Sequence, residues 1–326
     1  MAVQLSRNKI VILFVALFFS LSSWAQQGNT KTYSQQLSVT TENDRYMLQG
    51  RDGYYTNGLL INYTRAHSSK KQTVLKQIDQ YEIGQKLYTP YSRKIYSSSQ
   101  IDRPVTGYLY LKFSQSVFLQ HNQFWQWGAS AGAIGDASLG RGMQNTFHKL
   151  INVNSDWWGW IWDYQLKSEV GLNLQGSYAR GLLQDPSFLQ ITPVSQATLG
   201  TNFTNISQGL FLQIGRFNSL SQSAYWNASV QDRKTAQPIG KEIFFYYHPE
   251  VMYQLYNATV QGGMFVKDKG PITSSIEPFV FTHHVGAACA WNRYTLKLEA
   301  VFQSREAGSQ LHGHQYGSIQ GSYRFH

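Results

Sequence analysis

The stretch WDYQLKSEVGLNLQGSYA, Trp162 to Ala179, alternates between apolar and polar residues along its length. Every second residue from Trp162 to Tyr178 is mostly apolar, and the residues between them are mostly polar. A period of two is that of a β-strand with one apolar and one polar face. Strands of soluble sheets are usually about five or six residues long, so this longer run favours a strand that crosses an outer membrane, with lipid outside and a polar lumen inside. A solvent-exposed strand of a large sandwich is the alternative.

Less regular alternation of the same kind recurs along the rest of the chain. It covers residues 36–42, 59–66, 81–88, 107–119, 124–133, 193–201, 208–217, 243–256, 279–291, 293–303 and 315–325. With the first stretch, these segments predict about twelve strands, an even number as expected of a closed bacterial barrel. The last strand carries Tyr323 and Phe325 and resembles the C-terminal strand of outer-membrane proteins. We therefore predict an all-β fold, a closed antiparallel transmembrane β-barrel of about twelve strands.

One segment, 138–160, departs from the strand pattern. Met143, Phe147 and Leu150 recur there with the period of a helix. We predict a short amphipathic helix at about residues 143 to 151, inside a loop of the barrel.

The N-terminal residues resemble a secretory signal. Arg7 and Lys9 precede an apolar run that ends before the small-residue pattern at Ala25. We predict a signal peptide at residues 1–25 and one barrel domain at 26–326. No later segment has about 18 apolar residues in a row, as a spanning helix needs. Aromatic residues make up 15% of the chain and charged residues 14%, a balance that fits a barrel wall with aromatic girdles.

The composition also limits the kinds of chemistry and partner. The single cysteine, Cys289, excludes a disulfide framework within the chain, and its apolar setting argues against a catalytic thiol. A net charge of +10 suits an anionic membrane surface or substrate. We expect no nucleic-acid partner and a monomeric barrel.

Strand parity predicts which loops lie together. If the mature chain starts in the periplasm, the loops after the first, third and fifth strands lie on the extracellular side. These loops are 45–57, 89–106 and 135–160. The polar cluster at Asn43, Asp44 and Thr56, the basic pair Arg93 and Lys94, and the helix with Gln144 and His148 would then share one rim.

Together these residues form a plausible hydrolytic site, although Asn, Asp and Gly are also ordinary turn residues. A histidine with a pKa of about 6.5 can take a proton from water, so His148 is the candidate base. Asp44 and Asn43 offer hard oxygen ligands suited to Ca²⁺, which would polarise an ester carbonyl. Thr56 could orient a ligand or the water, and Arg93 and Lys94 could bind an anionic head group. Gln144 is a further candidate for substrate binding.

The chain resembles the family of outer-membrane lipid A 3'-O-deacylases. The motifs that carry the resemblance occur in the family's order over the first half of the mature chain: TEND at 41–44, DGYYTNG at 52–58, GQKLYTP at 84–90, RPVTGYLY at 103–110, GAIGDAS at 132–138, QNTFH at 144–148 and WGWIWDYQLKSEVGLNLQG at 158–176. The second half matches only in general character.

The resemblance implies a twelve-stranded, calcium-dependent barrel esterase that removes the 3'-linked acyloxyacyl chain of lipid A in lipopolysaccharide. It implies functional roles for Asn43, Asp44, Thr56 and His148, and places the family's basic pair on Arg93 and Lys94. The family pattern has a Glu six residues after the His, where this chain has Asn154. Asp156 or Glu169 is the candidate replacement.

Two other functions fit the same sequence. One is a non-catalytic barrel that binds lipopolysaccharide or acts as a pore, and the other is a barrel phospholipase. A change in the mass of lipid A would separate the first hypothesis from both.

Overall fold

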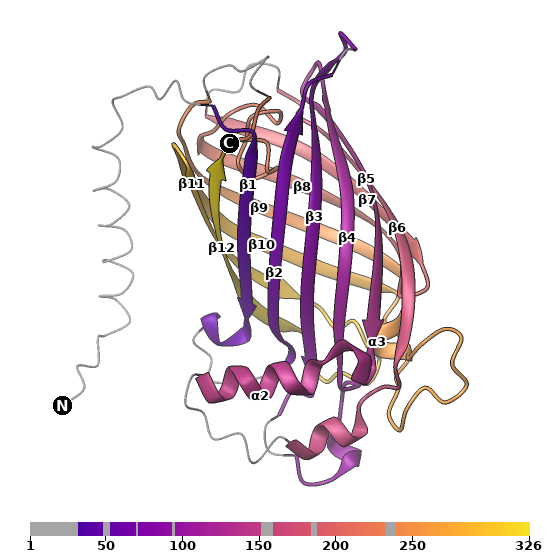
Figure 1. Cartoon of the computed structure of the whole chain (residues 1–326). Helices are drawn as coiled ribbons and strands as arrows, with labels where there is room; N and C mark the ends of the chain where they lie inside the picture. Colours follow the sequence, from indigo (N-terminus) through magenta and orange to yellow (C-terminus); the bar gives the residue numbers. More distant parts are fainter. Residues whose placement is uncertain are drawn as a thin grey trace, which may run out of the picture.

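A closed antiparallel barrel forms the body of the protein (Figure 1). The computed structural model describes residues 32–47, 53–69, 71–92, 95–150, 159–183, 188–232 and 239–326; of 147–150 and 159 only the backbone is described. In these residues, twelve strands pair in sequence order and β1 closes the barrel on β12. The strands are β1 Gln35–Asn43, β2 Tyr54–His67, β3 Val74–Thr89, β4 Thr106–Leu119, β5 Gln123–Ile134, β6 Glu169–Arg180, β7 Leu189–Gly200, β8 Phe203–Arg216, β9 Glu242–Asn257, β10 Phe279–Trp291, β11 Tyr294–Gln303 and β12 His314–Phe325.

The predicted fold class and strand number are therefore confirmed, and the alternative of a large sandwich is excluded. The predicted helix is present as α2, Gly140–Leu150, and starts three residues earlier than expected. The other helices of the described chain are short: η1 Asp44–Met47, η2 Ser98–Gln100, η3 Gly135–Ser138, η4 Gly159–Tyr164 and α3 Ala258–Gln261. None of the described helices is long and apolar enough to cross a membrane. The expected signal peptide, 1–25, lies outside the described residues.

The prediction of one unbroken strand from Trp162 to Ala179 is wrong. The strand β6 begins only at Glu169, and Trp162 belongs to the 3-10 helix η4. Trp162 is buried in an apolar cluster with Leu87 and Val105 rather than exposed to lipid. The alternation misled because Trp162 and Leu166 are apolar for another reason: their side chains are buried in clusters at the rim.

The two faces of the wall differ as a transmembrane barrel requires. On β6, Val170, Leu172 and Leu174 are each more than 60% exposed on the outer face, whereas Asn173 between them is buried. The Asn173 amide donates to Ser130 Oγ of β5 at 3.2 Å. The outer face is thus apolar and the lumen is polar, as the alternation in the second half of the opening stretch predicted.

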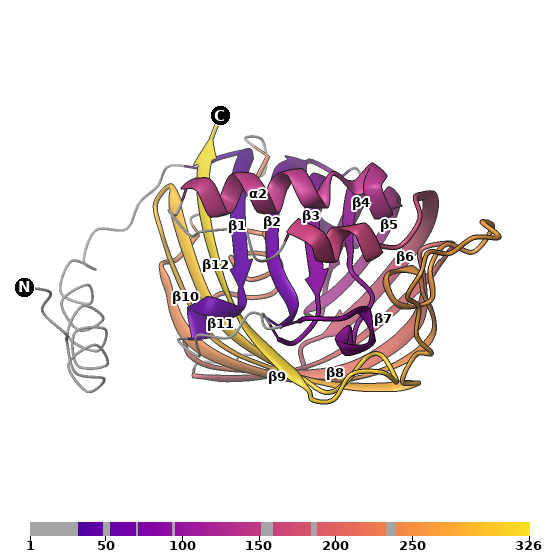
Figure 2. The same cartoon turned by 90° about the horizontal axis from the view of Figure 1, so that it is seen from below.

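Strand connections divide the loops between two ends of the barrel. The described parts of the odd-to-even loops all lie at the end that carries α2 and α3 (Figure 1); they include 44–47, 95–105, 135–150 and 159–168. We call this end the α2 rim. Seen along the barrel from that end, α2 runs beside the ends of β1 to β4 (Figure 2). The prediction that these loops share one rim is confirmed.

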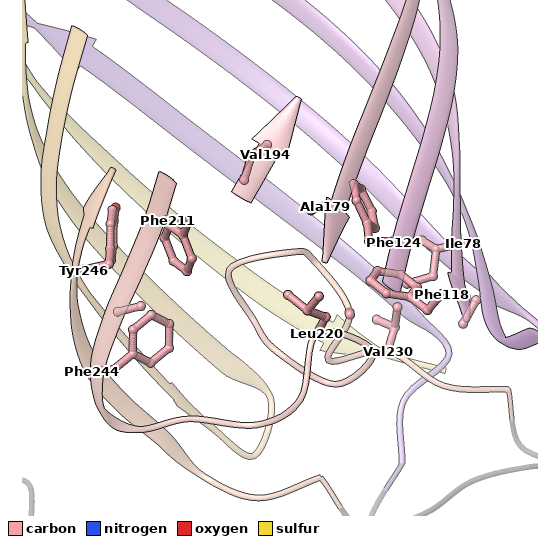
Figure 3. Packing of buried hydrophobic residues seen from close by; sticks show 13 residues of the cluster. Ile78, Phe118, Phe124, Ala179, Val194, Phe211, Leu220, Val230, Phe244 and Tyr246 are labelled. Carbon is pink, nitrogen blue, oxygen red and sulfur yellow. The ribbon is translucent and has the colours of Figure 1, made fainter. Parts of the chain in front are cut away.

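The described residues 217–232, which follow β8, pack inside the opposite end of the barrel. Leu220, Ala228 and Val230 of this segment are buried against inward-facing side chains that include Phe118 and Phe211 (Figure 3). The Lys76 ammonium, which points into the lumen, donates to the Ala228 carbonyl at 2.6 Å. We call the described segment 217–232 the plug. Because it inserts apolar side chains among those of the wall, it narrows this mouth of the barrel.

Candidate active site on the outer wall

The first group of candidate residues lies on the outer face of the barrel rather than in its lumen. Side chains of a strand alternate between faces, so Asn43 shares the outer face of β1 with the exposed residues Leu37 and Val39. Asn43 is nevertheless buried, and its side-chain oxygen accepts the Arg45 amide at 2.8 Å. The adjacent residue on β2 is Asn57.

A bulge at the start of β2 sets the position of Thr56. The register between β2 and β3 shifts between Tyr55 and Asn57, which adds one residue to β2 and redirects its side chains. Tyr55 donates to Glu42 in the lumen, whereas the Thr56 and Thr89 hydroxyls are hydrogen-bonded at 2.5 Å and buried. Thr89 shares the outer face of β3 with the exposed Ile83. Thr56 therefore belongs to the outer face, next to Asn57.

A layer made of η3, α2 and η4 covers the outer face of β3 and β4 next to this site. Outward-facing Gln85 donates to the Ser138 carbonyl at 2.5 Å. Two glycines permit the close approach: a Cβ on Gly140 would lie 2.8 Å from the Trp162 ring, and one on Gly107 would lie 3.1 Å from the Gly140 Cα. Larger residues at either position would push the layer away from the wall.

One buried hydrogen bond joins α2 to the rest of this layer. The Trp162 indole N–H donates to the side-chain oxygen of Gln144, and both side chains are buried. Sequence reasoning predicted that Gln144 binds substrate, and nothing in the structure tests that role. The observed contact gives Gln144 a definite role in holding α2 in place.

His148 lies on α2, four residues beyond Gln144. Residues four apart on a helix lie on one side of it, so position 148 is on the same side of α2 as the buried Gln144. The helix runs from the end of β4 towards that of β1 in both views (Figures 1 and 2). The second half of α2, with position 148, thus lies near the strands that carry Asn43 and Thr56.

Asp44 follows directly on Asn43, in η1, and is buried. Its Oδ2 accepts the Gly53 amide at 2.7 Å, across the loop that connects β1 to β2. Among the described residues, no three His, Cys, Asp or Glu side chains come together as metal ligands. Asp44 and Asn43 supply the hard oxygen donors that Ca²⁺ prefers, but fewer than the six to eight oxygens that it takes.

Four candidate residues fall outside the described chain: Arg93, Lys94, Asn154 and Asp156. Glu169, the other candidate for orienting His148, is described and engaged elsewhere. Its carboxylate accepts backbone N–H groups of Met264, Phe265 and Val266 at 2.7 to 3.0 Å. These bonds fix the loop between β9 and β10 to the start of β6, so the structure gives Glu169 a structural role at the rim.

Sequence reasoning missed a buried ion pair at the same rim. Arg103 is fully buried and donates through Nε and Nη2 to Glu306 Oε1 at 3.0 and 2.8 Å, and through Nη2 to Thr259 at 3.0 Å. Burial alone would raise the pKa of Glu306, but the Arg103 charge and hydrogen bonds hold this pKa below its usual value. The pair links three loops that are remote in sequence, which strand alternation cannot detect.

Fold and site together define a class of protein. The chain is a membrane β-barrel whose buried polar cluster lies on the outer face of the wall, at the rim that also carries a loop helix. A family model described as "Outer membrane protein LpxR" matches residues 12–325. The chain belongs to this family of outer membrane proteins, and its place is the outer membrane.

Comparison with solved structures supports the fold. LpxR from Salmonella typhimurium matches with a TM-score of 0.71 and 20% sequence identity, over 89% of this chain and 100% of that chain. The beta domain of the Bordetella autotransporter BrkA matches with a TM-score of 0.48 and 10% identity, over 90% of this chain and 99% of that chain, a likeness too low to support an argument. No curated protein sequence matches the chain.

Proposed function

We propose that this protein is an outer-membrane esterase that hydrolyses the 3'-linked acyloxyacyl chain of lipid A. The observation that carries the proposal is the position of the candidate site on the outer, lipid-facing side of the wall: Asn43 and Thr56 are buried there, and α2, the helix that bears His148, packs against β3 and β4 at the same rim. A lipid in the surrounding leaflet can reach such a site by moving along the wall. A solute in the lumen cannot.

The proposed reaction uses water as the nucleophile. His148 accepts a proton from water as the water oxygen bonds to the ester carbonyl carbon. The bond from that carbon to the sugar oxygen then breaks, and the proton passes to the sugar oxygen. The products are the free acyloxyacyl acid and a 3'-hydroxyl on the sugar. Asn43 and Thr56 orient the water and the ester, while Arg93 and Lys94 bind the anionic head group.

Calcium is part of the proposal. Bound Ca²⁺ would polarise the ester carbonyl and stabilise negative charge on its oxygen. Asp44 would hold the ion through its carboxylate and Asn43 through its amide oxygen, since both are hard oxygen donors at one point of the rim. Asp44 also accepts the Gly53 amide, so ion binding and the conformation of this loop would be coupled.

The structure disfavours the pore hypothesis. The plug packs Leu220 and Val230 against inward-facing aromatic side chains of the wall, and Lys76 is hydrogen-bonded to it. An open pore needs a wet lumen from end to end. Activity on phospholipid remains the second candidate, because a site on the outer wall faces phospholipid as well as lipid A.

Purified barrel in lipid vesicles separates these functions. Lipid A vesicles should release acyloxyacyl acid, and vesicles of phospholipid alone should release no fatty acid. Equal release from both would favour a phospholipase, and release from neither by folded barrel would remove the esterase assignment. The same proposal places the α2 rim on the extracellular side, where an accessible tag inserted in the loop after β3 would be labelled on intact cells.

A further inference from the structure

A depression of about 970 Å³ lies in the wall across β2 to β7. Its lining is mostly apolar side chains of the outer face, joined by four residues at the alternate, lumen-facing positions: Glu82, Lys112, Ser130 and Asn173. The depression exists because β5 presents the small residues Ala129 and Ala131 between larger side chains of its neighbours. We call it the outer groove.

The strand register shows how the outer groove is shaped. Ala131 is paired with Leu111 of β4 on one side and with Leu172 of β6 on the other. Both leucines are more than 60% exposed. An alanine between two projecting leucines forms the floor of a channel with apolar sides, and the channel faces the hydrocarbon of the bilayer.

The groove lies on the same outward face of β2 as the candidate site. On β2, Asn57 is paired with Asn43, and Ile61 of the groove lies four residues further along the same strand. Four residues of strand span about 13 Å. Leu59 lies between them on the same face. The groove thus runs around the wall from β7 to β2, the strand that pairs with the site residue Asn43.

A row of aromatic side chains lies across the wall at the far side of the groove. Ring centroids of Tyr63 and Tyr81 are 6.3 Å apart, those of Tyr81 and Phe113 5.2 Å, and those of Phe113 and Trp127 5.5 Å. These bulky side chains pack against one another. The aromatic row therefore crowds the side of the groove that lies away from the α2 rim.

We infer that the outer groove binds an acyl chain of the membrane lipid whose ester lies at the candidate site, and that it selects this chain by length. The inference rests on the proposed function for the identity of the lipid. The occupant is an acyl chain because the groove opens on the membrane interior, is apolar on its outward face and lies on the same face of the wall as the site, about 13 Å along β2. The aromatic row limits the length of acyl chain that the groove accepts, and the small side chain of Ala131 makes the groove deep enough to hold the chain.

Filling the groove tests the inference. Ala131→Trp places an indole between Leu111 and Leu172. The matched control is Ala287→Trp on β10, because Ala287 also faces outward and is paired with the large residues Phe245 and Leu298. Heat-modifiable migration on gels shows that each variant has folded. Ala131→Leu serves as a smaller filling if the tryptophan variant does not fold.

Native mass spectrometry measures lipid binding without turnover. Each barrel carries His148→Ala, is incubated with lipid A in detergent, and is assayed for the lipid adduct. Ala131→Trp should reduce the adduct at least about ten-fold, equivalent to 1.4 kcal/mol of binding, and Ala287→Trp should leave it unchanged. Equal adducts in the two variants would overturn the inference. If lipid A binds in this pattern but barrel with His148 releases no acid, the groove stands and the proposed reaction fails.

Discussion

Trp162 donates its indole N–H to the side-chain oxygen of Gln144 in the buried layer outside the barrel wall. The bond joins η4 to α2, two parts of one long connection between β5 and β6. Next to it, Gly140 brings α2 against the Trp162 ring and Leu87 of β3. The helix that carries His148 is thus held on the wall by a defined contact.

Replacing Trp162 with Phe should loosen this layer. The buried Gln144 oxygen would lose its donor, at a cost of about 1 to 3 kcal/mol, so α2 would detach more often. We expect a fall of roughly ten-fold or more in deacylation, with normal barrel migration on gels. Trp125→Phe is the control, because Trp125 is exposed on the outer face of β5. Equal activities of the two variants would contradict the positioning role of Trp162.

His148→Ala and Asp44→Ala should each abolish ester hydrolysis, because one removes the proposed base and the other the proposed carboxylate ligand. Losing a general base typically costs about 10²- to 10⁴-fold in rate. The rate of acid release from lipid A vesicles is the measurement. The control is His121→Ala, because His121 lies in the turn between β4 and β5 at the opposite end of the barrel. This variant loses a histidine far from the site and should keep its activity. Full activity in either variant would show that the replaced residue is not part of the active site.

Calcium should be needed for activity and should stabilise the rim. We expect chelation to stop acid release and added Ca²⁺ to restore it. A ligand that binds only the folded state raises the unfolding temperature, so Ca²⁺ should raise it in the unmodified barrel but not in Asp44→Ala. Turnover that survives thorough chelation would refute the metal role.

The buried ion pair of Arg103 and Glu306 should contribute more to the free energy of unfolding than an exposed ion pair does. Glu306→Gln leaves Arg103 buried without its counter-charge, which costs about 3 to 5 kcal/mol. The control, Glu277→Gln, breaks the half-exposed pair of Glu277 with Arg305, for which about 0 to 1 kcal/mol is expected. Unfolding in urea with lipid present measures the loss of stability in each variant. Similar losses in the two variants would contradict the stabilising role of the buried pair.

The ion pair of Arg103 and Glu306 should also make the stability of the barrel depend on pH. The folded-state pKa of Glu306 is depressed, so its contribution to stability is present above the pKa of the unfolded chain and is lost as the pH falls through the folded-state pKa. The gap in stability between the unmodified barrel and Glu306→Gln should therefore shrink on acidification. A gap that widened in acid would contradict the sign.

Alternation along the chain predicted the barrel, the number of strands and the shared rim, since a period of two assigns faces and parity assigns ends. Alternation failed where contacts with other parts of the chain, rather than the local sequence pattern, determine the structure. Trp162 fits a strand by alternation but lies in η4, because its ring packs on Leu87 and Gly140. The start of α2 was placed too late because Gly140 and Gly142 are poor helix formers.

Which face of the wall carries the site was not predicted. It follows from the bulge between Tyr55 and Asn57, which brings Thr56 to Thr89 on the outer face. The long-range partners of Arg103 also needed the fold, because Thr259 and Glu306 are far from it in the sequence.

The mass of lipid A in cells that make this protein is the most direct test of the proposed activity. The barrel is co-expressed in a host whose lipid A carries a 3' acyloxyacyl group, and the lipid is extracted and weighed by mass spectrometry. Our account predicts a new species lighter by the mass of that group, absent when His148→Ala replaces the unmodified chain. Unchanged lipid A, with folded barrel present in the outer membrane, would contradict it.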